Sequence, residues 1–173
     1  MALTLYAATV PSYRQILASV AGLLTKAQAF CAERGLAPAD IIQARLASDM
    51  LPFSFQVRAT VGHSIGAIEA LRRGTYSPDR SPLPETFAEL EPLVARAEAA
   101  LEALDPGELE TLAEREVLFV SGERRLPFTG ENFLLSFAQP NFYFHAATAY
   151  DILRWKGVPI GKRDFTGQVR VKR

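Results

Sequence analysis

The stretch YRQILASVAGLLTKAQAFC, residues 13–31, decides the fold class, because its apolar side chains recur at alternating steps of four and three residues. This spacing lines them up on one side of an α-helix that packs against other helices at a shallow angle. The members of this stripe are Tyr13, Leu17, Val20, Leu24, Ala27 and Cys31. Arg34 followed by Gly35 predicts the end of the helix, because a basic last turn and a following glycine are typical stop signals.

Two further stretches have helical periodicity. The second helix is expected to follow Asp49, a candidate N-cap, and to stop at Gly74 after two arginines. Its expected apolar stripe is Phe55, Val61, Ile65 and Ile68. The third helix is expected to end at the sequence Asp105-Pro106-Gly107. Its stripe is Phe87, Leu90, Val94, Ala97, Leu101 and Leu104.

The last long stretch predicts a fourth helix that begins between Thr129 and Glu131 and runs to Lys156, with a kink or break at Pro140. Its expected stripe is Phe137, Phe144, Thr148, Ile152 and Trp155. Residues 114–129 alternate with period two around a Ser-Gly turn, which predicts a small β-hairpin between the third and fourth helices. Residues 75–84 contain three prolines and predict a loop.

These elements predict an all-α fold, a four-helix bundle with long connections before the second and fourth helices. We expect one domain over residues 1–173, with residues 160–173 as an extended tail.

Composition excludes several classes of protein. The chain is 49% hydrophobic and 22% charged, which excludes a disordered chain. Its 19 basic and 19 acidic side chains balance, so nucleic acid is not expected as a partner. Cys31 is the only cysteine, which favours the reducing cytoplasm. No apolar run of membrane-spanning length is apparent, and the N-terminus lacks the basic start of a signal peptide, so we expect no membrane association.

The charges are unevenly distributed along the chain. Residues 85–116 are strongly acidic, and residues 154–173 are basic. These segments are either ordinary solvated surface or complementary patches that help two copies associate. We expect a homodimer, because bundles of this size commonly pair across a helix face.

The chain contains two histidines, His63 and His145, which are the residues best suited to chemistry. Gly62 and Gly66 flank His63 inside a helical pattern, where glycine costs about 1 kcal/mol relative to alanine. They indicate either close helix packing or room for a ligand. His145 lies in the aromatic stretch PNFYFH, residues 140–145, where a buried, hydrogen-bonded imidazole and a metal ligand are both reasonable interpretations.

Three segments resemble a bacterial domain-of-unknown-function family that is grouped with the DinB/YfiT-like four-helix bundles. They are ARLASDMLP (44–52), QPNFYFHAATAYDILR (139–154) and GVPIGKRDF (157–165). The superfamily resemblance implies a metal site with one histidine on the second helix and two on the fourth, four residues apart. By position, His63 and His145 match two of these ligands. The positions four residues from His145 are Asn141 and Ala149, so the triad is incomplete.

Three hypotheses about function remain. In the first, the bundle binds a small molecule in a cleft near His63, Asn141, His145 and Tyr150, with Arg58 as a further pocket residue. In the second, the protein is a metal-dependent transferase or hydrolase of the DinB/YfiT-like type. A divalent zinc, nickel or iron ion would then bind His63 and His145, completed by Asn141, Glu69 or Asp151. In the third, the basic tail contacts nucleic acid or an acidic partner.

Overall fold

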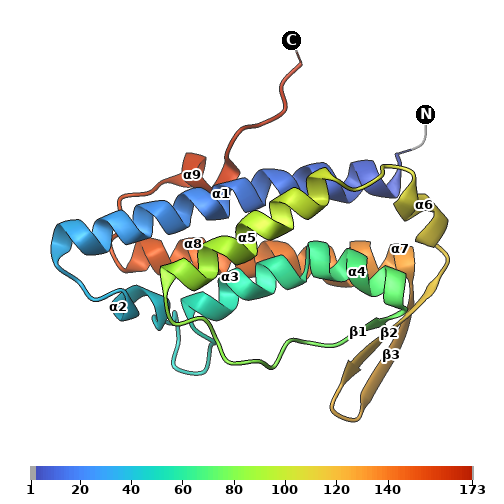
Figure 1. Cartoon of the computed structure of the whole chain (residues 1–173), viewed down its shortest axis with the longest axis horizontal. Coiled ribbons are helices and arrows are strands. Elements are labelled where there is room, and N and C mark those ends of the chain that lie inside the picture. The colour runs from blue at the N-terminus through green and yellow to red at the C-terminus, as the bar shows by residue number, and fades with distance from the viewer. Residues whose placement is uncertain (1–2, 173) are drawn as a thin grey trace.

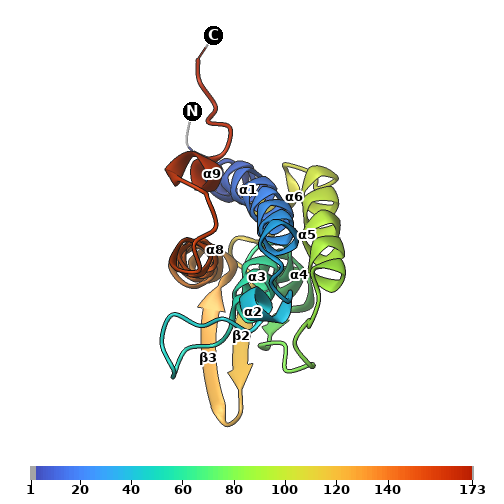
Figure 2. The same cartoon turned by 90° about the vertical axis from the view of Figure 1, so that its left-hand side faces the viewer.

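Four long helical segments pack side by side in the computed structural model, which describes residues 3–172. They are α1 (Leu5–Arg34), the pair α3 (Phe53–Gly62) and α4 (Ile65–Arg73), α5 (Phe87–Glu102), and α8 (Gln139–Trp155). Helix α1 contacts α5 and α8, and α3 contacts α5 and α8, so the core lies between all four segments. Figure 2 shows this arrangement end-on. The predicted helical bundle is confirmed.

The apolar stripes predicted for the first and third helices are confirmed in full. Every member of both stripes is buried in the core. Helix α1 begins after Thr4, whose side chain accepts a hydrogen bond from the Ala7 N–H, and it ends at Gly35 with φ 63°. It is long and apolar enough to cross a membrane by length and composition, but a core helix passes the same test. Here α1 packs against α3, α5 and α8.

The predicted second helix is broken between Gly62 and Ile65. His63 and Ser64 leave the helical path there, and Ser64 has φ −105° and ψ −97°. The Ser64 hydroxyl donates to the carbonyls of Thr60 and Val61, which satisfies the end of α3. Phe55 and Val61, which lie before the break, are only partly buried, while Ile65 and Ile68 after it lie in the core as predicted.

Asp49 is not the N-cap of this helix, so that prediction is wrong. Helix α3 begins at Phe53 after Pro52, and no side chain caps its start. Pro52 has an extended backbone and cannot continue a helix in the N-terminal direction without a clash. Asp49 is instead exposed in the preceding loop.

The predicted stripe of the fourth helix is only partly correct. A short helix α7 (Gly130–Asn132) and a π-helical segment η1 (Phe133–Ala138) precede α8, and Pro140 lies in the first turn of α8. The wider π turn shifts the helical phase, as expected where a proline cannot donate its backbone hydrogen bond. Within the regular helix α8, Phe144 is 56% exposed and Trp155 is 63% exposed, whereas Thr148 and Ile152 of the predicted stripe are buried. The residues that α8 buries are Phe142, Ala146, Thr148, Ala149, Ile152 and Leu153.

A small sheet lies beside the bundle and confirms the predicted hairpin. Strands β2 (Glu116–Ser121) and β3 (Arg124–Thr129) pair antiparallel across Gly122, which has φ 60°. The loop predicted from residue 75 begins instead with a strand, β1 (Thr75–Tyr76), which pairs parallel with β2. Figure 1 shows this sheet projecting from the end of the bundle near α4 and α7.

Three short helices complete the chain: α2 (Ala39–Ile42), α6 (Glu108–Leu112) and α9 (Lys162–Thr166). The segment expected to be an extended tail therefore contains a helix, and α9 packs against α1. Its position is held by an ion pair between Lys26 and Asp164 and by Ile160, which is buried in the core. Residues beyond Thr166 form no further helix up to residue 172.

Candidate functional site

The fold brings the two histidines together. His63 ends α3 at the helix break, and His145 lies in the middle of α8, which packs against α3. The centroids of the two imidazole rings are 5.4 Å apart, and the ring planes are inclined by 13°. The prediction that two imidazoles distant in the chain become neighbours agrees with this geometry.

His145 is held by Gln56 from helix α3. The Nε2 amide group of Gln56 donates to the carbonyl of Leu51 at 2.8 Å, which directs Oε1 toward His145. Oε1 then accepts a hydrogen bond from His145 Nδ1 at 2.8 Å. The proton of the neutral ring is therefore assigned to Nδ1, and Nε2 keeps its lone pair.

His63 is buried without a partner for one ring nitrogen. It is 9% exposed, and its Nδ1 atom makes no hydrogen bond with any residue from 3 to 172. A buried polar atom in this state costs about 1–3 kcal/mol of folding free energy. Such a cost in a packed core points to a role outside folding.

Four aromatic rings lie next to the histidine pair, two beside each histidine. Tyr76 and Phe137 lie 5.5 and 5.6 Å from His63, and Phe55 and Phe144 lie 5.6 and 5.3 Å from His145, measured between ring centroids. Burial raises the pKa of Tyr76 to about 12, and the negative charge of nearby Asp79 adds to this effect. Its hydroxyl therefore stays protonated at neutral pH. The site is an aromatic box with two neutral imidazoles at its centre.

The glycines beside His63 are not required by close helix packing. A Cβ atom at Gly62 would lie 3.6 Å from the Tyr76 hydroxyl, and one at Gly66 would lie 3.8 Å from the Val61 carbonyl. Both are ordinary van der Waals distances. The absent Cβ at Gly62 therefore leaves slightly more room on the Tyr76 side of the histidine pair.

Both imidazoles are held in the neutral form. Burial, together with a smaller contribution from the neighbouring His145, lowers the pKa of His63 to about 3. Burial also lowers the pKa of His145 to about 4. At neutral pH both rings can therefore accept a hydrogen bond or coordinate a cation without first losing a proton.

These shifts predict a specific loss of stability in acid. The unfolded chain has ordinary histidines with a pKa near 6.5, so it binds protons that the folded chain rejects. The histidines cost no folding free energy above pH 6.5. As the pH falls from 6.5 toward 4, each ring lowers the free energy of unfolding by up to about 1.4 kcal/mol per pH unit. We expect His63→Leu to remove about half of this histidine contribution in urea unfolding followed from pH 7 to 4. Equal slopes in the wild type and this variant would contradict neutral, buried rings.

The remaining predicted site residues do not all reach the pair. Asn141 lies one helical turn before His145, but its amide Nδ2 donates to the carbonyl of Phe137 at 2.7 Å. Tyr150 packs against Phe165 of α9, with ring centroids 5.8 Å apart, on a different side of α8. The prediction that Tyr150 lines the same cleft therefore has no support in the geometry.

Arg58 lies beside the box and is occupied by the chain itself. Its guanidinium lies 5.8 Å from the centroid of the Phe55 ring. It donates to the carbonyls of Asp79, Ser81 and Pro82 and forms an ion pair with Asp79 at 3.7 Å. Arg58 thus ties the loop that follows Tyr76 to helix α3.

The donor set does not fit the three-ligand metal centre that the resemblance implies. Glu69 forms an ion pair with Arg73 on the exposed side of α4, and Asp151 is exposed on α8. Between residues 3 and 172 no group of three histidine, cysteine, aspartate or glutamate side chains could hold a metal. Ala149 has no donor atom, so the described site offers two imidazoles where zinc sites normally have at least three protein ligands.

Sequence reasoning placed aromatic residues beside His145 but missed Gln56 and Tyr76 as site residues. Gln56 and His63 are separated by two helical turns, so their spacing could have placed both on one side of the same helix. Tyr76 lies in a segment interpreted as loop, and only its pairing with β2 brings it to His63. No local pattern identifies that contact.

The helical bundle and its small sheet place the chain in a class of protein, the DinB-like helical bundles. A crystal structure of a DinB family member from Shewanella denitrificans superposes with a TM-score of 0.80. That protein is 28% identical in sequence, and the match covers 98% of this chain and 95% of that chain.

The chain belongs to the family described as domain of unknown function DUF1993, whose model matches residues 5–166. This match confirms the resemblance to a domain-of-unknown-function family in the DinB-like superfamily. It includes both histidines and Gln56. No curated protein matches the chain.

Proposed function

We propose that this protein binds a small, uncharged, planar molecule at the histidine pair. The observation that carries the proposal is the buried, unpartnered Nδ1 atom of His63. A ligand that supplies the missing hydrogen bond would remove the cost of leaving this atom unsatisfied.

The surroundings support the chemical class of the ligand. The four aromatic rings favour a flat, apolar body. The low pKa values of His63 and His145 indicate that this site disfavours added positive charge. The ligand is therefore neutral, and it has an N–H or O–H group that donates to an imidazole nitrogen.

Phenol is a suitable probe, because it is planar and neutral and has one O–H donor, and toluene is its matched control without the donor. We expect phenol to shift the imidazole ¹⁵N resonances of both histidines in NMR titrations, and toluene to leave them in place. Equal responses to the two probes, or no response to either, would contradict the proposal.

His63→Leu separates binding from folding. Because leucine removes an unsatisfied polar atom, we expect the variant to be as stable as the wild type above pH 6.5, or more stable by up to about 1 kcal/mol. It should no longer bind phenol. Tyr150→Phe, which changes a ring on the other side of α8, is the control and should bind phenol like the wild type. A strongly destabilised His63→Leu protein would indicate a structural role for the ring.

The second candidate function is a metal-dependent transferase or hydrolase of the DinB/YfiT-like type. One observation favours it: His145 donates its Nδ1 proton to Gln56, as metal-ligating histidines commonly do with an outer partner. It ranks second because the described residues supply only two suitable donors. Elemental analysis of untagged protein purified without chelator distinguishes the two, with about one zinc, nickel or iron per chain expected only for the metal-dependent enzyme.

A further inference from the structure

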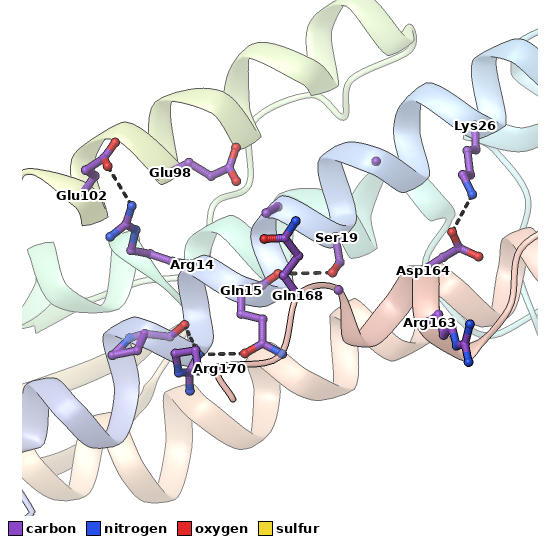
Figure 3. A pocket seen from close by; sticks show the side chains of 14 residues that line it. Arg14, Gln15, Ser19, Lys26, Glu98, Glu102, Arg163, Asp164, Gln168 and Arg170 are labelled. Carbon is purple, nitrogen blue, oxygen red and sulfur yellow. Dashed lines mark hydrogen bonds and ion pairs between the residues drawn. The ribbon is translucent and has the colours of Figure 1, made fainter. Parts of the chain in front are cut away.

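A large groove lies on the opposite side of the bundle from the sheet, along the outer surface of α1. Its volume is about 820 Å³, within the range of small-molecule sites. Helix α5 forms one wall, and α9 with the following residues forms the other. Figure 3 shows the groove from close by. Its floor includes Ala18 and Gly22, and a Cβ atom at Gly22 would have no atom within 4 Å, so the floor is open.

The wall formed by the C-terminal segment is fixed to α1. Gly167 lies so close to the helix that a Cβ atom there would approach the Ser19 hydroxyl oxygen to 2.5 Å, and its φ of 60° also favours glycine. Gln15 donates its side-chain amide to the carbonyl of Thr166 at 2.7 Å. The groove is therefore organised before any ligand arrives, which lowers the entropy cost of binding.

Arg170 also attaches the C-terminal segment to α1, and all of its hydrogen-bond acceptors there are uncharged. It donates to the carbonyl of Pro11 at 2.8 Å, to Gln15 Oε1 at 2.7 Å and to the Ser12 hydroxyl at 3.3 Å. Its positive charge is thus held at the groove without a carboxylate to offset it among residues 3–172.

The two walls have opposite unbalanced charge. On the α5 side, Arg14 pairs with Glu102 at 2.9 Å and leaves the carboxylate of Glu98 without an ion-pair partner among the described residues. Burial raises the pKa of Glu98, and so does the charge of Glu102, whereas Arg14 lowers it, so the two carboxylates share one guanidinium and this wall keeps an excess of negative charge. On the other side Lys26 offsets Asp164, so Arg163 and Arg170 contribute unbalanced positive charge.

We propose that this groove binds a zwitterionic small molecule, whose ammonium group contacts Glu98 and whose carboxylate contacts Arg170. A purely anionic ligand would leave Glu98 facing like charge, and a purely cationic ligand would face Arg170. A dipolar ligand satisfies both walls at once. This site is separate from the histidine pair and does not depend on the function proposed there.

Three matched probes test the proposal: 6-aminohexanoate, which has both charged ends, and hexanoate and hexylammonium, which have one each. In titrations of the full chain followed by NMR at low salt, we expect 6-aminohexanoate to bind about tenfold more tightly than either single-charge probe. The affected resonances should be those of α1, α5 and α9.

Two charge-neutralising variants test which groove residue contacts each charged end of 6-aminohexanoate. Glu98→Gln and Arg170→Gln should each weaken 6-aminohexanoate binding about tenfold. Glu91→Gln removes an exposed carboxylate from the same helix outside the groove, and should leave binding unchanged. Equal affinities for the three probes, or an unaffected Glu98→Gln protein, would overturn the proposal. So would light scattering that shows a dimer lost on Glu98→Gln, because a second copy would then occupy the groove.

Discussion

Replacing Phe142 with alanine should lower the free energy of unfolding by about 4 kcal/mol, as measured by urea denaturation. The Phe142 side chain has no exposed surface, and its ring centroid lies 4.6 Å from that of Tyr13 on α1. The substitution would open a cavity between α8 and α1, because rigid helices on both sides cannot collapse to fill it.

Phe144→Ala is the matched control for this result. It removes the same ring two residues further along α8, where the side chain is 56% exposed. We expect a loss of no more than about 1 kcal/mol, since little apolar surface is returned to water. If Phe144→Ala lowered the free energy of unfolding more than Phe142→Ala, the buried side of α8 would be the one predicted from the sequence, which contains Phe144.

Gly130→Ala should destabilise the protein by about 3 kcal/mol, because a methyl group there has no space. A Cβ atom at Gly130 would overlap the carbonyl oxygen of Leu112 and press against that of Ala113. The backbone cannot easily retreat, since the adjacent Glu131 N–H donates to the Ala113 carbonyl at 2.8 Å. The junction between α6 and α7 therefore requires glycine.

Gly22→Ala supplies the comparison for that prediction. Gly22 lies inside α1, and an added Cβ atom would have open space around it. We expect this variant to be more stable than the wild type by about 0.5–1 kcal/mol, because alanine restricts the unfolded chain and favours the helix. If both glycine variants lose stability equally in urea denaturation, the explanation by local space is wrong.

The histidine pair combines features that oppose folding. The buried Nδ1 of His63 has no hydrogen-bond partner among residues 3–172, and below pH 6.5 the lowered pKa values of both rings add a further cost. Unsatisfied groups that lower the stability of a fold are common in binding sites, because a ligand provides the interactions that the folded chain lacks. Gln56 orients His145 through the hydrogen bond between its Oε1 atom and His145 Nδ1. A homodimer, a cytoplasmic location and a bound metal stay predictions.

The sequence alone determined the features that depend on neighbouring residues. The stripes of α1 and α5 follow from helical periodicity, and the hairpin follows from period-two alternation around Gly122. The two histidines were also identified as the residues best suited to chemistry, and the resemblance placed both in one site.

Only the tertiary structure decided the features that depend on contacts between distant segments. The break after Gly62 and the π-helical turn before Pro140 interrupt the predicted helices, and packing leaves Phe55 partly buried and Phe144 exposed, so the stripes through these two residues were only partly correct. Tyr76 reaches His63 because β1 pairs with a strand more than 40 residues later. The physical reason is that local periodicity fixes the direction of a side chain only while the helix stays regular, whereas long-range packing selects where it deviates.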